Sequence, residues 1–167
     1  MRKYFLYITI ITTTLLFNSC FKISFKGTTI DPKIQTFSVQ YFNNRAKLIE
    51  PTFSQRFTEN LKTYIESNTR LRYINGMGDV DFSGTVNTYQ ITPQSFKAGT
   101  AAMTRFSIGV KVKFINAVNP DEDFEKTFSA FQEFESTTAF SSVESSLSEE
   151  IMEEIIEQIF NASFVNW

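Results

Sequence analysis

Apolar and polar residues alternate along several stretches of the chain, which is the pattern of half-buried β-strands. The clearest stretch is Thr104 to Asn116, where apolar residues occupy every second position and the other side carries Arg105, Lys111 and Lys113. Further strands are predicted over Thr36 to Phe42, Leu71 to Ile74, Asp79 to Ile91 and Glu122 to Glu135, and Phe21 to Phe25 forms a short strand or a tether.

The alternation has a defect in the predicted strand Asp79 to Ile91. Its apolar residues change parity between Val86 and Tyr89. Either a β-bulge or a strand end covered on both sides explains this change. The predicted strand Thr36 to Phe42 shows no such defect, so its odd-numbered positions through Tyr41 are expected to share one face.

An amphipathic helix is predicted over Glu50 to Asn68, because apolar residues recur there every three or four positions. Two starts compete. Thr52 with Gln55 three residues later fits a capping box, which makes Thr52 the N-cap. Pro51 instead fits the first helical position.

A second helix is predicted from about Ser142 to Phe164. Ile155 lies in the middle of its apolar stripe, and acidic residues such as Glu153 occupy the opposite face. Ser141 and Glu144 fit a capping box at its start.

This order of elements predicts an α+β fold of one domain. A two-layer arrangement buries both helical stripes against one face of an antiparallel or mixed sheet of about four strands. The other face of that sheet is expected to be exposed to solvent.

The N-terminus predicts export. Arg2 and Lys3 precede an apolar, Thr-rich run that is too short for a stable membrane span, and Ser19 and Cys20 follow it. Residues 1–19 are therefore interpreted as a signal peptide and residues 20–167 as the mature domain. Cys20 is the expected lipid attachment site, which would hold the protein on a membrane surface. An ordinary signal peptide with an unmodified cysteine is the alternative.

Composition excludes several functions. The chain has no histidine, and its one cysteine is expected to be acylated, so imidazole bases, thiol nucleophiles and nearly all transition-metal sites are excluded. A single cysteine also allows no disulfide within the chain. No glycine-rich nucleotide-binding motif occurs, and no cofactor is expected. Without residues 1–19 the formal net charge is −4, which argues against a nucleic-acid partner.

Two carboxylate pairs are the remaining candidates for catalysis. Asp79 and Asp81 share one strand face, and Asp121 and Asp123 follow Pro120. Turn chemistry or a solvated strand edge explains both pairs, so a carboxylate-dependent hydrolase is a minor alternative.

The chain resembles the LptE family of lipopolysaccharide-assembly lipoproteins. The resemblance rests on the N-terminal Cys motif, on ISFKGTTIDPKIQTFSVQYFNNRA, on the helix PTFSQRFTENLKTYIES, and on the strands DFSGTVNTYQITP, RFSIGVKVKFIN and FEKTFSAFQEFES. It implies a non-enzymatic outer-membrane lipoprotein that plugs an LptD-type β-barrel, assists its assembly and contacts lipopolysaccharide. It also implies a lipid-anchored location on the periplasmic side or in the barrel lumen.

Arg105, Lys111 and Lys113 are the candidate contacts to lipopolysaccharide phosphates or to acidic groups of the barrel wall. The alternative is that these three cations only maintain solubility. A lipoprotein scaffold for another outer-membrane complex would share every feature except the family resemblance.

Overall fold

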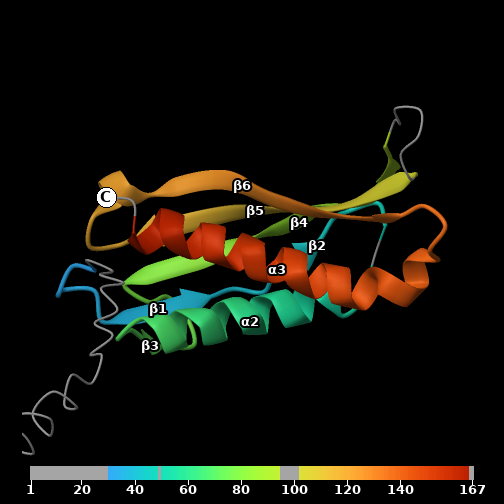
Figure 1. Cartoon of the computed structure of the whole chain (residues 1–167). Coiled ribbons are helices and arrows are strands. Elements are labelled where there is room, and N and C mark those ends of the chain that lie inside the picture. Colours follow the sequence, from blue (N-terminus) through green and yellow to red (C-terminus); the bar gives the residue numbers. More distant parts are fainter. Residues whose placement is uncertain (1–29, 49, 95–101, 166–167) are drawn as a thin grey trace, which may run out of the picture.

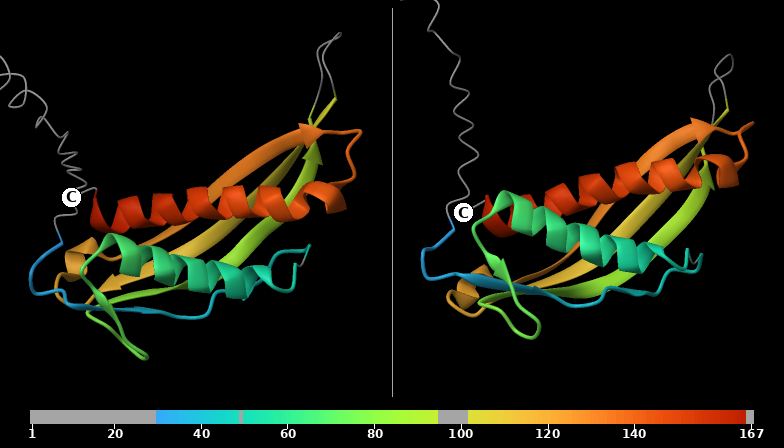
Figure 2. Two further views of the ribbon diagram at one scale, coloured as in Figure 1. Left: turned by 60° about the horizontal axis from the view of Figure 1, so that its bottom comes forward. Right: turned by 90° about the horizontal axis from the view of Figure 1, so that it is seen from below.

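A six-stranded mixed sheet forms one layer of the protein, and two helices on the same face of that sheet form the other (Figures 1 and 2). The computed structural model describes residues 30–48, 50–94 and 102–165. The predicted α+β class with both helices on one face is confirmed. The predicted number of about four strands is too low, because short strands add to the sheet. Residues 1–29, including the predicted strand or tether Phe21 to Phe25, lie outside the described residues.

The long strands lie at one side of the sheet and the short strands at the other. The order is β3-β1-β4-β5-β6, and β2 pairs separately with β4. β4, β5 and β6 are antiparallel neighbours, whereas β1 and β2 pair with β4 in parallel and β1 pairs with β3 in parallel. The strands are β1 (Thr36–Val39), β2 (Asn43–Asn44), β3 (Arg72–Tyr73), β4 (Val80–Pro93), β5 (Met103–Asn116) and β6 (Phe124–Glu135).

The parallel pairs explain the position of the first helix. Parallel neighbours need a crossover connection, and α2 (Phe53–Asn68) supplies it between β1 and β3. Thr52 is the N-cap, as the capping-box hypothesis placed it. Its hydroxyl, however, donates to Glu50 Oε1 and makes no cap bond, so the capping box itself is absent.

The second helix, α3 (Phe140–Phe164), starts before its predicted beginning. Its N-cap is Ala139, and Ser141 lies inside the first turn, so the capping box predicted for Ser141 and Glu144 is wrong. Phe140 explains the earlier start, because its ring packs on Phe106 and Phe134 at centroid distances of 5.0 and 5.8 Å. Tertiary packing thus extends the helix beyond its local start signal.

The core between the two layers is rich in phenylalanine. Edge-to-face and stacked ring pairs link the sheet to both helices, for example Phe53 to Tyr89 and Phe82 to Phe164. Gly84 permits close packing inside this layer, because a Cβ atom there would collide with the Phe42 ring and the Lys111 carbonyl. Fully buried side chains include Phe37, Phe42, Phe57, Leu61, Phe106, Ile108, Val110, Val112, Phe114, Ile151, Ile155 and Ile159.

Two predictions about strand faces have different outcomes. The parity change in β4 is a register irregularity between Val86 and Thr88, so the predicted bulge is confirmed. The prediction that Tyr41 shares the buried face of Phe37 is wrong. β1 ends at Val39, the alternation breaks, and Phe42 is buried while Tyr41 is 55% exposed.

Candidate functional site

The face of the sheet that points away from α2 and α3 carries the predicted site residues, and we call it the open face. Alternation along β5 places Arg105, Lys111 and Lys113 there, while the even-numbered apolar residues from Phe106 to Phe114 are directed to the core. Lys111 and Lys113 are exposed and Arg105 is half-buried. The rest of the open face is built largely from small hydroxyl and amide side chains: Ser83, Thr85, Thr88, Gln90, Thr92, Ser107, Thr127 and Ser129.

Arg105 lies apart from the two lysines. Its guanidinium group donates twice to Glu133 Oε1, at 2.7 and 3.1 Å, and covers the Phe131 ring at 3.9 Å from the centroid. Phe131 lies on the solvent-facing side of β6 and is 49% exposed. Cross-strand register explains these contacts, because Arg105 is directly opposite Glu133 and Phe131 is opposite Ser107.

Lys111 and Lys113 line a hollow of about 400 Å³ on the open face. Lys111 forms an ion pair with Glu125 of β6. The hydrogen bond and charge from Lys111, with a smaller contribution from Lys113, lower the pKa of the Glu125 carboxyl below its usual value. Hydroxyl and amide groups of β4 complete the hollow.

Arg45 is the site residue that sequence reasoning missed. It follows β2, its backbone N–H donates to the Val86 carbonyl at 2.8 Å, and its side chain lines the same hollow as the two lysines. No local signal could place it there, because a two-residue strand pairing in parallel with β4 leaves no periodic pattern. The hollow therefore carries three cations and one carboxylate.

The structure gives the carboxylate pair at the start of β4, Asp79 and Asp81, a structural role. Asp79 Oδ2 accepts hydrogen bonds from the backbone N–H groups of Gln35 and Thr36 and from the Thr36 hydroxyl, at 2.8 to 2.9 Å. Asp81 is 5% exposed and its Oδ1 accepts from Ser38 and from Gln40. Both carboxylates thus fasten β1 to β4.

The second pair is explained by its turn. Asp123 Oδ1 accepts the backbone N–H of Asn116 at 2.7 Å and so closes the connection between β5 and β6. Asp121 belongs to the short 3₁₀ turn η1 (Pro120–Glu122) and is exposed.

Among the residues that the structure describes, no group of three or more acidic or cysteine side chains is arranged to hold a metal ion. None of the helices in these ranges combines the length and hydropathy of a membrane span. Cys20 and the signal peptide lie outside the described residues.

Solved structures with a similar fold include bacterial lipoproteins. The protein CT253 of Chlamydia trachomatis has a TM-score of 0.56 at 8% identity, covering 80% of this chain and 99% of its own. Lipoprotein B of Nitrosomonas europaea has a TM-score of 0.53 at 11% identity, covering 75% and 79%. A minor lipoprotein of Acinetobacter baumannii has a TM-score of 0.50 at 14% identity, covering 76% and 90%. At these identities the likeness concerns the fold alone.

A comparison with curated protein sequences found no match. The family model described as LptE, lipopolysaccharide-assembly, matches residues 34–163. That range extends from the segment before β1 almost to the end of α3, so it includes the whole sheet. The match confirms the resemblance and the expectation of a non-enzymatic role. The chain therefore belongs to the LptE family of lipopolysaccharide-assembly lipoproteins.

Proposed function

We propose that this chain is the lipoprotein partner of an LptD-type β-barrel. It occupies the barrel lumen, assists barrel assembly and contacts lipopolysaccharide through the open face. A lipid on Cys20 holds it at the outer membrane. Family membership supports the general role, and the observation that carries the detailed proposal is the polar, cation-bearing open face.

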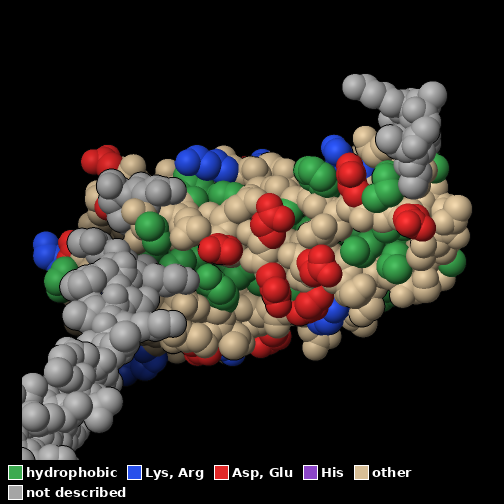
Figure 3. All heavy atoms as spheres, in the orientation of Figure 1, with side chains coloured by type: hydrophobic (Ala, Val, Ile, Leu, Met, Phe, Trp, Pro, Cys, Tyr) green, Lys and Arg blue, Asp and Glu red, His purple; other side chains and the backbone are tan. Residues whose placement is uncertain are grey.

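The chemistry of both large surfaces suits a polar lumen. Transmembrane barrels with wide lumens have polar interiors, so a plug needs a hydrophilic exterior around a sealed core. The open face meets this need with hydroxyl, amide and charged groups. The helix side meets it with acidic residues, which gather over α3 in Figure 3. They include Glu149, Glu150, Glu153, Glu154 and Glu157.

The hollow on the open face suits phosphate groups. Arg45, Lys111 and Lys113 outnumber Glu125, so the hollow has a net positive charge at neutral pH. Ammonium and guanidinium groups donate charge-assisted hydrogen bonds to phosphate oxygens. The helix side repels the same phosphates, so lipopolysaccharide is expected on the open face only. Arg105 contributes less, because Glu133 already neutralises its charge.

Site-specific photocrosslinking in outer membranes tests the partner and the face together. A crosslinker at Thr85, beside the hollow, should capture lipopolysaccharide. One at Glu150, on the helix side, should capture the barrel protein without lipopolysaccharide. Failure to capture a barrel protein from either position contradicts the partner, whereas equal capture of lipopolysaccharide at both positions contradicts the assignment of the face.

The anchor requires a separate experiment. Cys20→Ala should release the protein from the membrane fraction or leave it unprocessed, because two or more acyl chains hold a protein stably where one is marginal. Ser24→Ala, in the same segment, is the control and should fractionate as the wild type does. A Cys20→Ala protein with wild-type mass and fractionation would refute the anchor.

Depletion of the protein tests the role in barrel assembly. It should lower the amount of assembled barrel and make cells permeable to bulky apolar antibiotics.

A further inference from the structure

β6 lies at one end of the sheet, and its outer side is a long strand edge (Figure 1). Among the residues that the structure describes, no strand pairs with β6 on that side. β6 is 12 residues long, pairs with β5 without a register shift, and contains neither proline nor glycine. Proteins commonly interrupt exposed edges with bulges, prolines or short strands, because unpaired backbone groups can add a further strand. The edge of β6 has none of these interruptions.

Two contacts identify the backbone groups of β6 that point outward. The backbone N–H of Ser136, directly after β6, donates to the Ala102 carbonyl at 2.8 Å, so even-numbered residues are directed toward β5. The Ser129 carbonyl instead accepts from the Gln158 side chain of α3, at 3.5 Å. Because the N–H and C=O of one residue in an antiparallel strand point the same way and alternate between neighbours, the odd-numbered residues point outward. We call the central four of them the free edge: Thr127, Ser129, Phe131 and Glu133.

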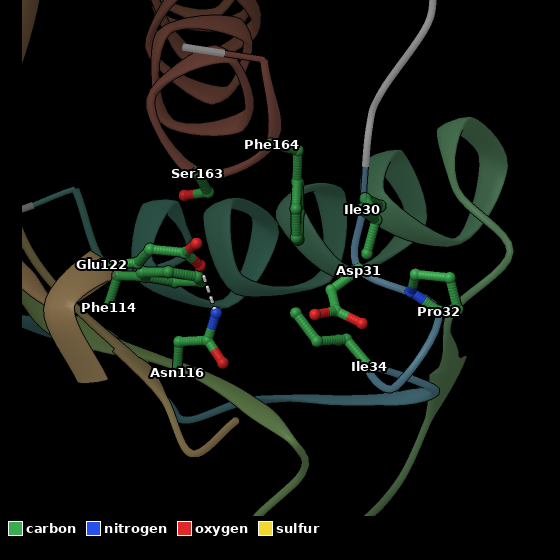
Figure 4. A pocket seen from close by; sticks show the side chains of 9 residues that line it. All are labelled: Ile30, Asp31, Pro32, Ile34, Phe114, Asn116, Glu122, Ser163 and Phe164. Atoms are coloured by element: carbon green, nitrogen blue, oxygen red, sulfur yellow. Dashed lines mark hydrogen bonds between the residues drawn. The ribbon is translucent and has the colours of Figure 1, made fainter. Parts of the chain in front are cut away.

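Hydrogen bonds hold both ends of β6 and so keep the free edge extended. At its start, the Asn116 side chain donates to Glu122 (Figure 4), and Asp123 accepts the Asn116 backbone N–H. At its end, the hydroxyl groups of Thr104 and Ser136 form a hydrogen bond of 2.7 Å. A preformed edge favours docking, because only the added strand must become ordered.

The surroundings of the free edge determine which sequence can dock there. On the helix side, Gln158 also donates to Glu154 at 3.2 Å, which places an exposed carboxylate beside the edge. Figure 3 shows further acidic side chains along α3. On the open face, Phe131 is 49% exposed and offers an apolar surface. Side chains of an added strand alternate between these two sides, so basic residues fit the helix side and apolar residues fit the open face.

We propose that the free edge docks an extended segment of a partner protein as a further strand of the sheet. The segment carries basic residues toward α3 and apolar residues beside Phe131. Backbone hydrogen bonds attach it, and the two flanks select its sequence. A second copy of this chain fits poorly, because pairing about a two-fold axis would bring two acidic flanks together. The docking does not depend on the barrel partner proposed above.

Synthetic peptides test the chemistry of the docked segment. A labelled peptide that alternates lysine and valine should bind the full chain in detergent, measured by fluorescence anisotropy at low salt. A peptide that alternates glutamate and valine should bind at least about tenfold more weakly, because it meets Glu154 with like charge. A peptide that alternates lysine and proline keeps the positive charge but lacks every second backbone N–H, so it should also bind about tenfold more weakly.

Two pairs of variants locate the binding. Ser129→Pro removes an outward N–H that β5 does not use, and proline is tolerated at strand edges. The variant should therefore fold, as checked by circular dichroism, yet bind the lysine–valine peptide about tenfold more weakly. Ser129→Ala keeps the N–H and should bind as the wild type does. Glu154→Gln should weaken binding severalfold and reduce its salt dependence. Glu157→Gln removes the same charge from the side of α3 that faces α2 and should change binding little.

Amide hydrogen exchange measured by NMR needs no variant. The lysine–valine peptide should slow exchange at Ser129 and Phe131 and leave Phe128 and Ala130 unchanged, because β5 already protects the even-numbered residues. Peptide binding without this alternating protection would overturn the proposal, and so would equal binding of all three peptides. Protection of the free edge that rises with protein concentration in the absence of peptide would identify a second copy as the occupant and would overturn it as well.

Discussion

The phenol of Tyr89 donates a hydrogen bond to Glu144 Oε1 at 2.8 Å and so ties β4 to the first turns of α3. Tyr89 is only 2% exposed, and its ring contacts Phe53 and Phe106. A buried aromatic residue with a satisfied hydroxyl contributes both packing and orientation. This pair therefore helps to set how the second helix lies on the sheet.

Tyr89 predicts a stability change at alkaline pH. Burial, followed by the hydrogen bond to Glu144 and its charge, raises the pKa of Tyr89 above the usual 10.0. In the unfolded chain the phenol ionises near pH 10, whereas in the folded protein it stays neutral. The contribution of Tyr89 to the free energy of unfolding should thus be constant below pH 10. Above pH 10 it should fall by up to about 1.4 kcal/mol per pH unit.

The measurement is denaturant unfolding between pH 8 and pH 11, with Tyr89→Phe as the test variant. Tyr89→Phe should show a shallower fall than the wild type above pH 10. Identical slopes for the two proteins would show that Tyr89 does not control this range.

Ile155 tests the assignment of the helix faces. Its side chain is fully buried in the middle of α3, so Ile155→Ala should leave a cavity and cost about 2 to 5 kcal/mol of unfolding free energy. Glu153→Ala, two residues away and exposed, should cost no more than about 0.5 kcal/mol. Equal losses of unfolding free energy in the two variants, measured in urea, would mean that the buried and exposed faces of α3 are wrongly assigned.

Asp79 predicts a loss of stability in acid. The Gln35 backbone N–H, and then the Thr36 hydroxyl and N–H, lower the pKa of Asp79 below 3.8. Its contribution is therefore present above pH 3.8 and is lost as the pH falls through the lower folded value. Asp79→Asn should be less stable at neutral pH and should lose less on acidification than the wild type. Asp121→Asn, an exposed control, should keep the stability of the wild type at neutral pH.

Gly84 predicts a packing defect. In Gly84→Ala the added methyl group collides with the Lys111 carbonyl and the Phe42 ring, which must move apart. Overpacking of this kind costs about 1 to 3 kcal/mol. Gly109→Ala, where the nearest neighbour is the Thr88 side chain at 3.1 Å, should cost less. Thermal unfolding of the two variants checks the order, and a more stable Gly84→Ala would disprove it.

The cations of the open face predict salt-dependent binding. Changing Arg105, Lys111 and Lys113 together to Gln should preserve the fold, because none contributes to the core, yet weaken binding of lipopolysaccharide or of the barrel at low salt. The Lys111 and Lys113 double variant should account for most of the loss, and Arg105→Gln for little, since Glu133 already pairs with Arg105. If the triple variant binds lipopolysaccharide and the barrel as tightly as the wild type at low salt, these cations serve only to keep the protein soluble.

The sequence alone determined the elements with strong periodicity. The alternation in β5 identified its core face and its charged face, and the three- and four-residue spacing identified both helices. These patterns are local, and burial of one face is enough to enforce them. The family resemblance came from the same segments. It was carried by structural residues, so it indicated identity without locating a site.

Only the tertiary structure decided which distant residues meet. Parallel pairing of β2 with β4 brought Arg45 to the lysines, and no sequence period records such a pairing. Cross-strand register gave Arg105 its partner Glu133, which separated it from the two lysines it accompanies in the sequence. Charge at a residue is encoded locally, but the neighbours that neutralise or reinforce it are set by strand order and register, which are long-range properties of the fold.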